Sequence, residues 1–157
     1  MKFLCDQMLG TLAKWLRLFG FDTFYADSEI DDRELLEIAK NEDRVIITRD
    51  KQLIEMGKKQ DLKIVKIATT DLDEQLNHIL KDVEINRKNV LSRCSICNST
   101  IEEIKKNDVE NKVPKRVFDS NEKFWYCSKC NKIYWAGTHY DKILTKLNMI
   151  KKNPNIS

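Results

Sequence analysis

The feature that most constrains the fold is a short apolar run in the middle of the first half of the chain. Residues 45–48 read Val-Ile-Ile-Thr, and two charged residues, Arg49 and Asp50, follow directly. A run of β-branched apolar residues is typical of a strand that is buried on both faces, as in the centre of a parallel sheet. Because unpaired charges are costly in such an interior, the strand is expected to end before Arg49. Ligands bind at the carboxyl ends of strands in open α/β sheets, so Asp50 is a candidate site residue.

The segments around this run alternate between strand-like and helix-like patterns. Strands are expected at residues 3–5, 23–26, 45–48 and 62–67. A segment with helical spacing of apolar residues follows each strand, and Gly20 and Gly57 are expected to end the first and third helices. Four strand–helix units in succession predict an α/β domain in which helices flank a parallel sheet. The polar segment 82–93 marks a boundary, which divides the chain into domains at residues 1–92 and 93–157.

The composition is that of a globular protein with an uneven distribution of charge. Hydrophobic residues make up 41% and charged residues 34% of the 157 positions. No run reaches the roughly 18 apolar residues of a membrane span, and the first residues lack the layout of a signal peptide. We therefore expect a cytoplasmic protein without membrane contact. Residues 1–92 carry a net charge of −3 and residues 93–157 carry +6. This split suggests cation binding in the first part and polyanion binding in the second, with chance variation on a solvated surface as the alternative.

Four of the five cysteines form two Cys-x-x-Cys pairs in the basic part, Cys94 with Cys97 and Cys127 with Cys130. The two-residue gap directs both sulfurs of a pair toward a common centre, and two pairs complete the tetrahedral shell of Zn²⁺. In an intracellular chain this pattern indicates metal binding rather than disulfides. A redox dithiol is the alternative. A shell of four thiolates has no open position, so we predict a structural zinc ion in a small zinc ribbon, from which 29 intervening residues loop out. The fifth cysteine, Cys5, is expected to be a small buried residue of the first strand.

Aromatic residues lie among lysines around the second cysteine pair. Such a mixture suits the binding of unpaired bases and phosphates, although a small domain also uses aromatic residues as its core. Residues 135–139 read Trp-Ala-Gly-Thr-His, so a glycine turn presents a hydroxyl and an imidazole beside a tryptophan. His139 is therefore a candidate for phosphate binding or proton transfer, and a purely structural hydrogen bond is the other interpretation.

Acidic residues follow the predicted strands. Asp6 comes after the first strand and Asp50 after the third, and Asp31 and Asp32 open the helix that follows the second. Carboxylates that meet at one edge of a sheet repel one another unless a divalent cation lies among them. Oxygen ligands favour Mg²⁺ or Mn²⁺, ions that bind phosphate oxygens and activate water.

These acidic residues also have an ordinary interpretation as helix N-caps. Asp31, followed by Glu34 three residues later, resembles a capping box. Three nearby cations, Lys14, Arg17 and Arg49, are candidates for holding the phosphates of a substrate beside the acidic residues.

Several of these segments together resemble one known family. They are Phe-Leu-Cys-Asp at residues 3–6, Met-Leu-Gly at 8–10, Leu-Ala-Lys-Trp-Leu-Arg at 12–17, Thr-Arg-Asp at 48–50, Arg-Cys-x-x-Cys-Asn at 93–98 and Tyr-Trp-x-Gly-Thr-His at 134–139. The family is that of PIN-like ribonucleases with a C-terminal zinc ribbon, named after the C-terminal domain of the mutator-seven exonuclease. The similarity extends over residues 1–147.

The resemblance implies a PIN-like α/β fold, metal-dependent RNase activity and a metal-binding role for Asp6, Asp32 and Asp50. Relatives often carry another acidic residue two positions after the last of these. This chain has Gln52 there, so the sequence fits either one or two catalytic ions. We therefore expect a ribonuclease that hydrolyses RNA with Mg²⁺ or Mn²⁺ and binds it with its zinc ribbon.

Two other functions fit parts of the pattern. The first is a non-catalytic RNA- or ribosome-binding module that has kept the fold and binds RNA in a salt-sensitive manner. The second is a phosphoacceptor receiver domain, because Asp6 and Asp50 both follow strands. That domain requires an acidic pair after the first strand, whereas Gln7 follows Asp6, and it requires a fifth strand that the sequence does not predict.

Overall fold

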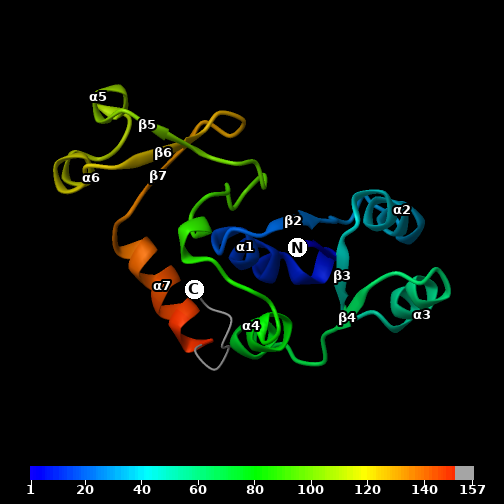
Figure 1. Ribbon diagram of the computed structural model, residues 1–157. Helices are drawn as coiled ribbons and strands as arrows, with labels where there is room; N and C mark the ends of the chain where they lie inside the picture. The colour runs from blue at the N-terminus through cyan, green and yellow to red at the C-terminus, as the bar shows by residue number, and fades with distance from the viewer. Residues whose placement is uncertain (151–157) are drawn as a thin grey trace.

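The computed structural model describes residues 1–150, in which a parallel sheet with helices on both faces is followed by a second, smaller sheet (Figure 1). The first sheet has four parallel strands in the order β2-β1-β3-β4. Its strands are β1 (Lys2–Cys5), β2 (Asp22–Tyr25), β3 (Val45–Thr48) and β4 (Ile64–Lys66), and its helices are α1 (Gly10–Leu18), α2 (Asp32–Glu42), α3 (Lys51–Lys59) and α4 (Leu72–Leu80). The α/β class and the parallel sheet that the sequence predicts are confirmed.

Alternation along the strands divides the apolar side chains between two layers of helices. In β1, Phe3 and Cys5 belong to the same buried cluster as α1 and α4, whereas Leu4 belongs to the cluster of α2 and α3. In β3, Ile47 and Ile46 divide in the same way. Since successive residues of a strand point to opposite faces, the β-branched run of β3 fills both layers at once.

The strand order creates a switch point between β1 and β3. The chain passes from β1 to β2 on one side and from β3 to β4 on the other side, while β1 and β3 are neighbours. In open α/β sheets, the crevice at the carboxyl ends of two such strands is where ligands bind. Asp6 follows β1 and Asp50 lies two residues after β3, so both acidic residues lie at this crevice.

The second part of the chain is an antiparallel sheet with a long closing helix. Its strands are β5 (Glu102–Ile104), β6 (Phe124–Cys127) and β7 (Lys132–Trp135), and its helices are α5 (Lys106–Val109), α6 (Lys115–Ser120) and α7 (Thr138–Met149). Helix α7 returns from this sheet to the first part and lies beside α4 (Figure 1). Lys146 on α7 donates to Asp73 at 2.5 Å, and its ammonium group lies 5.1 Å from the Trp15 ring centroid.

One buried cluster therefore includes residues from both parts of the chain. Leu12 and Leu16 of α1 belong to it together with Ile143 and Leu147 of α7. The division at residues 1–92 and 93–157 remains a prediction about organisation, and residues 151–157 of the second range lie outside the described part.

One local prediction needs correction, and one part of the chain has structure that was not predicted. Helix α3 continues through Gly57 to Lys59, because Gly57 is a buried contact point with β4 rather than a helix end. A Cβ at this position would lie 2.3 Å from Ile64 Cδ1. The looped-out insert also contains α5, α6 and the fully buried Val109, none of which the sequence analysis predicted.

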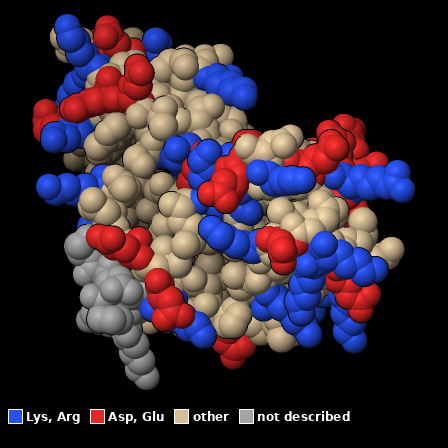
Figure 2. Space-filling view, turned by 45° about the vertical axis from the view of Figure 1, so that its right-hand side comes forward, with Lys and Arg blue, Asp and Glu red and all other residues tan. Residues whose placement is uncertain are grey.

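The surface and the helices add two observations. On the face shown in Figure 2, acidic and basic side chains are interspersed, so neither sign of charge covers a continuous area there.

Within residues 1–150, no helix combines the length and the apolarity that crossing a membrane requires.

Replacement of Gly20 by alanine tests the turn between α1 and β2. Gly20 has φ +97°, and a Cβ there would lie 2.3 Å from the Asn89 carbonyl oxygen. Because both the backbone conformation and the space oppose a side chain, G20A should lower the free energy of unfolding by about 2–4 kcal/mol. The matched change G57A should alter it by less than about 1 kcal/mol, since the end of the Ile64 side chain can move and alanine favours helix. Urea unfolding of both variants checks this prediction, and equal losses would contradict it.

Candidate active site and metal centre

The buried hydroxyl of Thr48 connects the two acidic residues at the switch point. Thr48 Oγ1 donates a short hydrogen bond to Asp6 Oδ2 and accepts one from the Asp50 backbone N–H at 3.0 Å. The Asp6 N–H donates to the Ile47 carbonyl at 3.3 Å. The ends of β1 and β3 are therefore held together by side chain and backbone, and the position of each carboxylate is determined by the sheet.

Asp6 is buried, with 6% of its surface exposed. Its Oδ1 accepts from the Met8 N–H at 3.1 Å and so caps a short 3₁₀ helix at Gln7–Leu9. An ionised carboxylate has about four lone-pair sites. The two hydrogen bonds to Asp6 leave acceptor capacity for a cation or a water molecule.

Asp50 is exposed and caps α3. Its Oδ1 accepts from the N–H groups of Gln52 and Leu53, at 2.8 and 3.1 Å. Within residues 1–150, no hydrogen bond involves Asp50 Oδ2, so one oxygen orients the carboxylate and the other keeps its acceptor capacity.

Asp32 lies at the start of α2, where the carboxylate of Asp31 forms the N-cap by accepting from the Glu34 N–H at 2.8 Å. Partial burial raises the pKa of Asp32, and the negative charges of Asp50, Asp31 and Asp6 raise it further. Asp32 opens the helix that follows β2, so it lies on the carboxyl-end side of the sheet, close enough to the other carboxylates for their charges to act on it. The structure thus brings the three acidic residues predicted from distant parts of the sequence to one edge of the sheet.

These carboxylates form an open group rather than a closed cage. Among the described residues, only the four cysteines form a group of three or more metal-ligating side chains close enough to hold an ion directly. An open set of oxygen ligands fits Mg²⁺, which usually keeps several waters and is held by one or two carboxylates together with substrate phosphates. The donor chemistry therefore fits a hard cation that is bound jointly with a substrate.

The candidate phosphate ligands have different surroundings. Lys14 on α1 is exposed, and Arg49 is half-buried directly after β3. His139 lies in the first turn of α7, where burial and then the charges of Lys14, Lys132 and Lys142 lower its pKa. The charge of Lys14 on α1 therefore acts on His139 on α7 and disfavours the charged form of its imidazole.

Arg17 has a different surrounding from the one that the sequence analysis expected. Its side chain is buried, and its guanidinium donates to the carbonyls of Thr23, Ser95 and Ile96, at 2.9, 3.1 and 2.9 Å. Ser95 and Ile96 lie between the first two cysteines. We infer that Arg17 joins α1 and β2 to the first cysteine loop, in place of the phosphate contact expected for it.

A second connection runs from β2 to the same loop. Asp22 accepts hydrogen bonds from Arg44 and from the Asn98 side chain, both at 2.7 Å, and Arg93 lies 3.9 Å away. Burial alone would raise the pKa of Asp22, but the hydrogen bonds from Arg44 and Asn98 and the charges of Arg44 and Arg93 outweigh it and lower the pKa. Asp22 therefore remains ionised at neutral pH.

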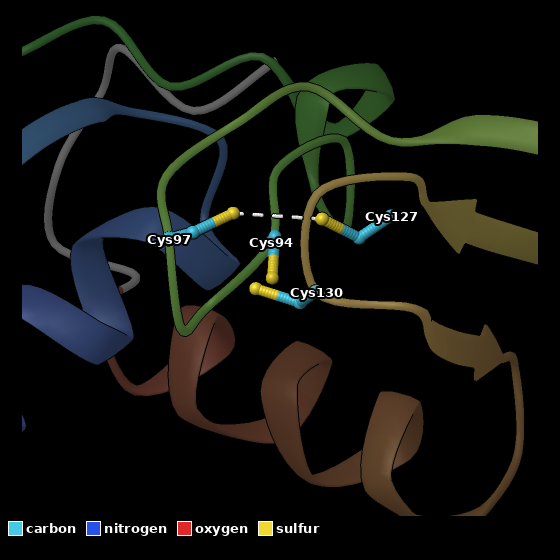
Figure 3. A group of neighbouring side chains, drawn as sticks. All are labelled: Cys94, Cys97, Cys127 and Cys130. Atoms are coloured by element: carbon cyan, nitrogen blue, oxygen red, sulfur yellow. Dashed lines mark hydrogen bonds between the residues drawn. The ribbon is translucent and has the colours of Figure 1, made fainter.

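The four cysteines of the two pairs converge on one point (Figure 3). Their Sγ atoms all lie within 4.8 Å of one another, and the Cys97 and Cys127 sulfurs are 3.5 Å apart. Four sulfurs about 2.3 Å from a tetrahedral Zn²⁺ would lie at separations of this kind. The group fits a structural zinc ion, whereas Cys5 lies apart in the core, where burial raises the pKa of its thiol far above the usual range.

The two cysteine loops have the same sequence pattern and backbone geometry. Cys-Ser-x-Cys-Asn occurs at residues 94–98 and again at 127–131. Asn98 and Asn131 both have a left-handed backbone, with φ of 70° and 55°. Asparagine tolerates this conformation better than most residues, so the residue after each pair turns the chain and leaves both sulfurs pointing inward.

Tyr134 supports the metal centre from β7. Its hydroxyl accepts from the Ser95 N–H at 3.1 Å and lies 3.0 Å from Cys94 Sγ, to which it can donate. The sequence analysis missed this role, and that of Thr48, because a tyrosine or threonine in a strand gives no signal of the long-range partner its hydroxyl meets.

The chain matches the model of the Mut7-C RNAse domain over residues 1–147 and belongs to this family. Membership supports a nuclease-related role for the chain. Among curated proteins, it is 30% identical over 100 residues to the human protein named exonuclease mut-7 homolog. That alignment covers 60% of this chain and 11% of the human protein, so the chain corresponds to a small part of this relative. No solved structure matches the chain significantly.

Zinc removal tests the connection between Arg17 and the metal centre. R17M leaves the carbonyls of Ser95 and Ile96 without their donor, so it should loosen the loop and release zinc at an at least about tenfold lower chelator concentration. R33M makes the same change at an exposed position on α2 and should behave like the wild type. A colorimetric zinc assay during EDTA titration measures the release. Equal midpoints for the two variants would contradict the proposed role of Arg17.

Valine at position 48 tests the hydroxyl bridge. T48V keeps the branched shape but leaves Asp6 Oδ2 and the Asp50 N–H without a partner, so it should lower the free energy of unfolding by about 1–3 kcal/mol. T48S keeps the hydroxyl and should cost no more than about 1 kcal/mol. Urea unfolding compares the two. If T48S were the more damaging variant, packing rather than hydrogen bonding would explain the contribution of Thr48 to stability at this edge.

Proposed function

We propose that this chain is a metal-dependent ribonuclease that hydrolyses RNA phosphodiester bonds at the carboxyl ends of β1 and β3. The single observation that supports this most strongly is the position of Asp6 and Asp50 after the adjacent strands β1 and β3, at the switch point of the sheet, with Asp32 near enough for their charges to act on it, in a family described as an RNase domain. We propose that the sheet with its helices is PIN-like, as the sequence resemblance implies.

In this proposal Asp6 and Asp50 hold Mg²⁺ or Mn²⁺, and Asp32 either holds the ion or orients the attacking water. When bound, such an ion polarises the phosphate and makes a bound water more acidic. Asp50 presents its free oxygen from a helix N-terminus, where backbone N–H groups fix the carboxylate. The partly buried Asp32 has a raised pKa, which suits a group that accepts a proton from water.

The cations around the site complete the proposal. Arg49 follows β3 directly and makes no ion pair within residues 1–150, so its guanidinium is free for a phosphate oxygen. Lys14 on α1 offers a second cation for a phosphate, and the imidazole of His139 on α7, on which the charge of Lys14 acts, can donate a hydrogen bond to a phosphate oxygen. The zinc ribbon, which carries net positive charge, would bind the RNA strand outside the reacting bond.

One observation favours a second function. The carboxylates do not form a closed ligand group, which is also what a non-catalytic RNA-binding module that has kept the fold would show. Such a module binds RNA without divalent-dependent cleavage. Metal-dependent turnover therefore distinguishes the two functions.

Replacement of single aspartates by asparagine tests the proposed activity. D50N keeps an N-cap, because asparagine caps helices as well as aspartate does, but it removes the charge that holds the cation. We expect D50N to lower kcat/KM for cleavage of end-labelled RNA in Mn²⁺ by at least about a hundredfold, and D6N to abolish cleavage. The zinc-loaded protein is used throughout.

The matched control is D43N. Asp43 follows α2, is exposed and has a left-handed backbone that asparagine also adopts, at the opposite edge of the sheet. This variant should cleave RNA at the wild-type rate. Cleavage by D6N and D50N at wild-type rates would overturn the proposal, and salt-sensitive binding without cleavage by the wild type would favour the non-catalytic module.

A further inference from the structure

A cavity at the junction of the two parts of the chain has the chemistry of a base-binding site. It has a volume of about 310 Å³ and lies between the linker at residues 87–92, the ribbon sheet and α7. Val90 and Leu91 from the linker and Ile101 from the ribbon supply apolar lining, and the half-buried rings of Trp125 and Tyr140 form aromatic walls. This volume is at the lower end of the range of small-molecule sites.

Hydrogen bonds hold the cavity in shape. The Leu91 N–H donates to the Leu18 carbonyl of α1 at 2.9 Å, and the Ile101 N–H donates to the Ser92 carbonyl at 3.0 Å. The linker is thereby fixed to α1 on one side and to the ribbon on the other. A site that is preformed in this way loses little conformational entropy when a ligand binds.

The rim carries charges of both signs. Arg87 and Lys88 are exposed on the linker side, and Arg87 is held across the junction by a 2.7 Å hydrogen bond to the Asn148 side chain on α7. Glu103 is exposed on the ribbon side. It is paired in register with Trp125 on the neighbouring antiparallel strand, so both side chains lie on the same face of the sheet.

We propose that this cavity binds one unpaired base of an RNA strand, with the base stacked on Trp125 and the adjoining phosphate at Arg87 and Lys88. Aromatic rings beside cations are the features with which proteins bind single-stranded nucleic acids. The proposal rests on RNA being the substrate class of the proposed function, and it adds a subsite separate from the acidic edge.

Glu103 gives the subsite a preference among bases. A carboxylate accepts a hydrogen bond from the amino group at N4 of cytosine. Uracil presents a carbonyl oxygen at the same ring position, which a carboxylate repels. The subsite should therefore bind cytosine more tightly than uracil, although the two rings have the same size.

Fluorescence anisotropy with labelled oligo(C) and oligo(U) tests this preference. The zinc-loaded protein is used in EDTA-free buffer without added divalent metal ions, so that RNA can bind without being cleaved. We expect oligo(C) to bind at least about fivefold more tightly than oligo(U), and E103Q to reduce this difference. W125A should weaken oligo(C) binding about tenfold, as expected for the loss of one stacked base, with W125F intermediate. K88E alters an exposed side chain, so it should weaken binding at low salt and flatten the salt dependence without affecting the fold.

The control K59E makes the same charge change at the end of α3, which packs on the opposite face of the first sheet. It should bind like the wild type, and zinc content and urea unfolding show whether each variant is folded. The proposal would be overturned if folded K88E and W125F bound oligo(C) with wild-type affinity. It would also be overturned if the wild type bound the two oligonucleotides with equal affinity. If the wild type cleaved RNA while the binding results overturned the subsite, the proposed nuclease function would remain intact. If binding depended on the cavity but no metal-dependent cleavage occurred, the subsite would be supported and the proposed nuclease function contradicted.

Discussion

A buried guanidinium group, which must have hydrogen-bond acceptors, joins the two parts of this molecule. Arg17 lies in α1, and its three carbonyl partners are supplied by Thr23 in β2 and by Ser95 and Ile96 in the first cysteine loop. Leaving a buried charge without partners is far more costly than the net gain from an ordinary hydrogen bond. The loop must therefore take up its ligand-holding shape against α1, and the metal centre and the parallel sheet depend on each other.

At the other end of the sheet, ordinary helix capping positions the acidic residues. Asp50 caps α3 through Oδ1, and Asp6 caps a 3₁₀ helix through Oδ1. Capping and cation binding are alternatives only if they need the same lone pairs, and a carboxylate has enough for both. The caps orient the carboxylates, and Thr48 sets their spacing from inside the sheet.

The sequence was informative wherever a short-range pattern determines structure. The β-branched run ending at Thr48 predicted a central strand, and the position of Asp50 after it placed this residue at the correct edge. Features that depend on contacts between residues distant in sequence could not be predicted. The sequence pattern predicts a helix end at Gly57, but this residue provides room for Ile64. The pattern also predicts a surface cation at Arg17, but the cysteine loop packs over this side chain. The insert helices α5 and α6 were missed because they are short and carry little apolar periodicity.

The return of α7 to the first part of the chain has a consequence for how sequences of this kind diverge. Lys146 contacts both Trp15 of α1 and Asp73 of α4, so a substitution at any one of the three positions changes the surroundings of the other two. Such contacts favour compensating changes, and the three positions should covary among homologues. The ribbon and its helix are therefore expected to be inherited together with this particular sheet rather than exchanged as an independent module.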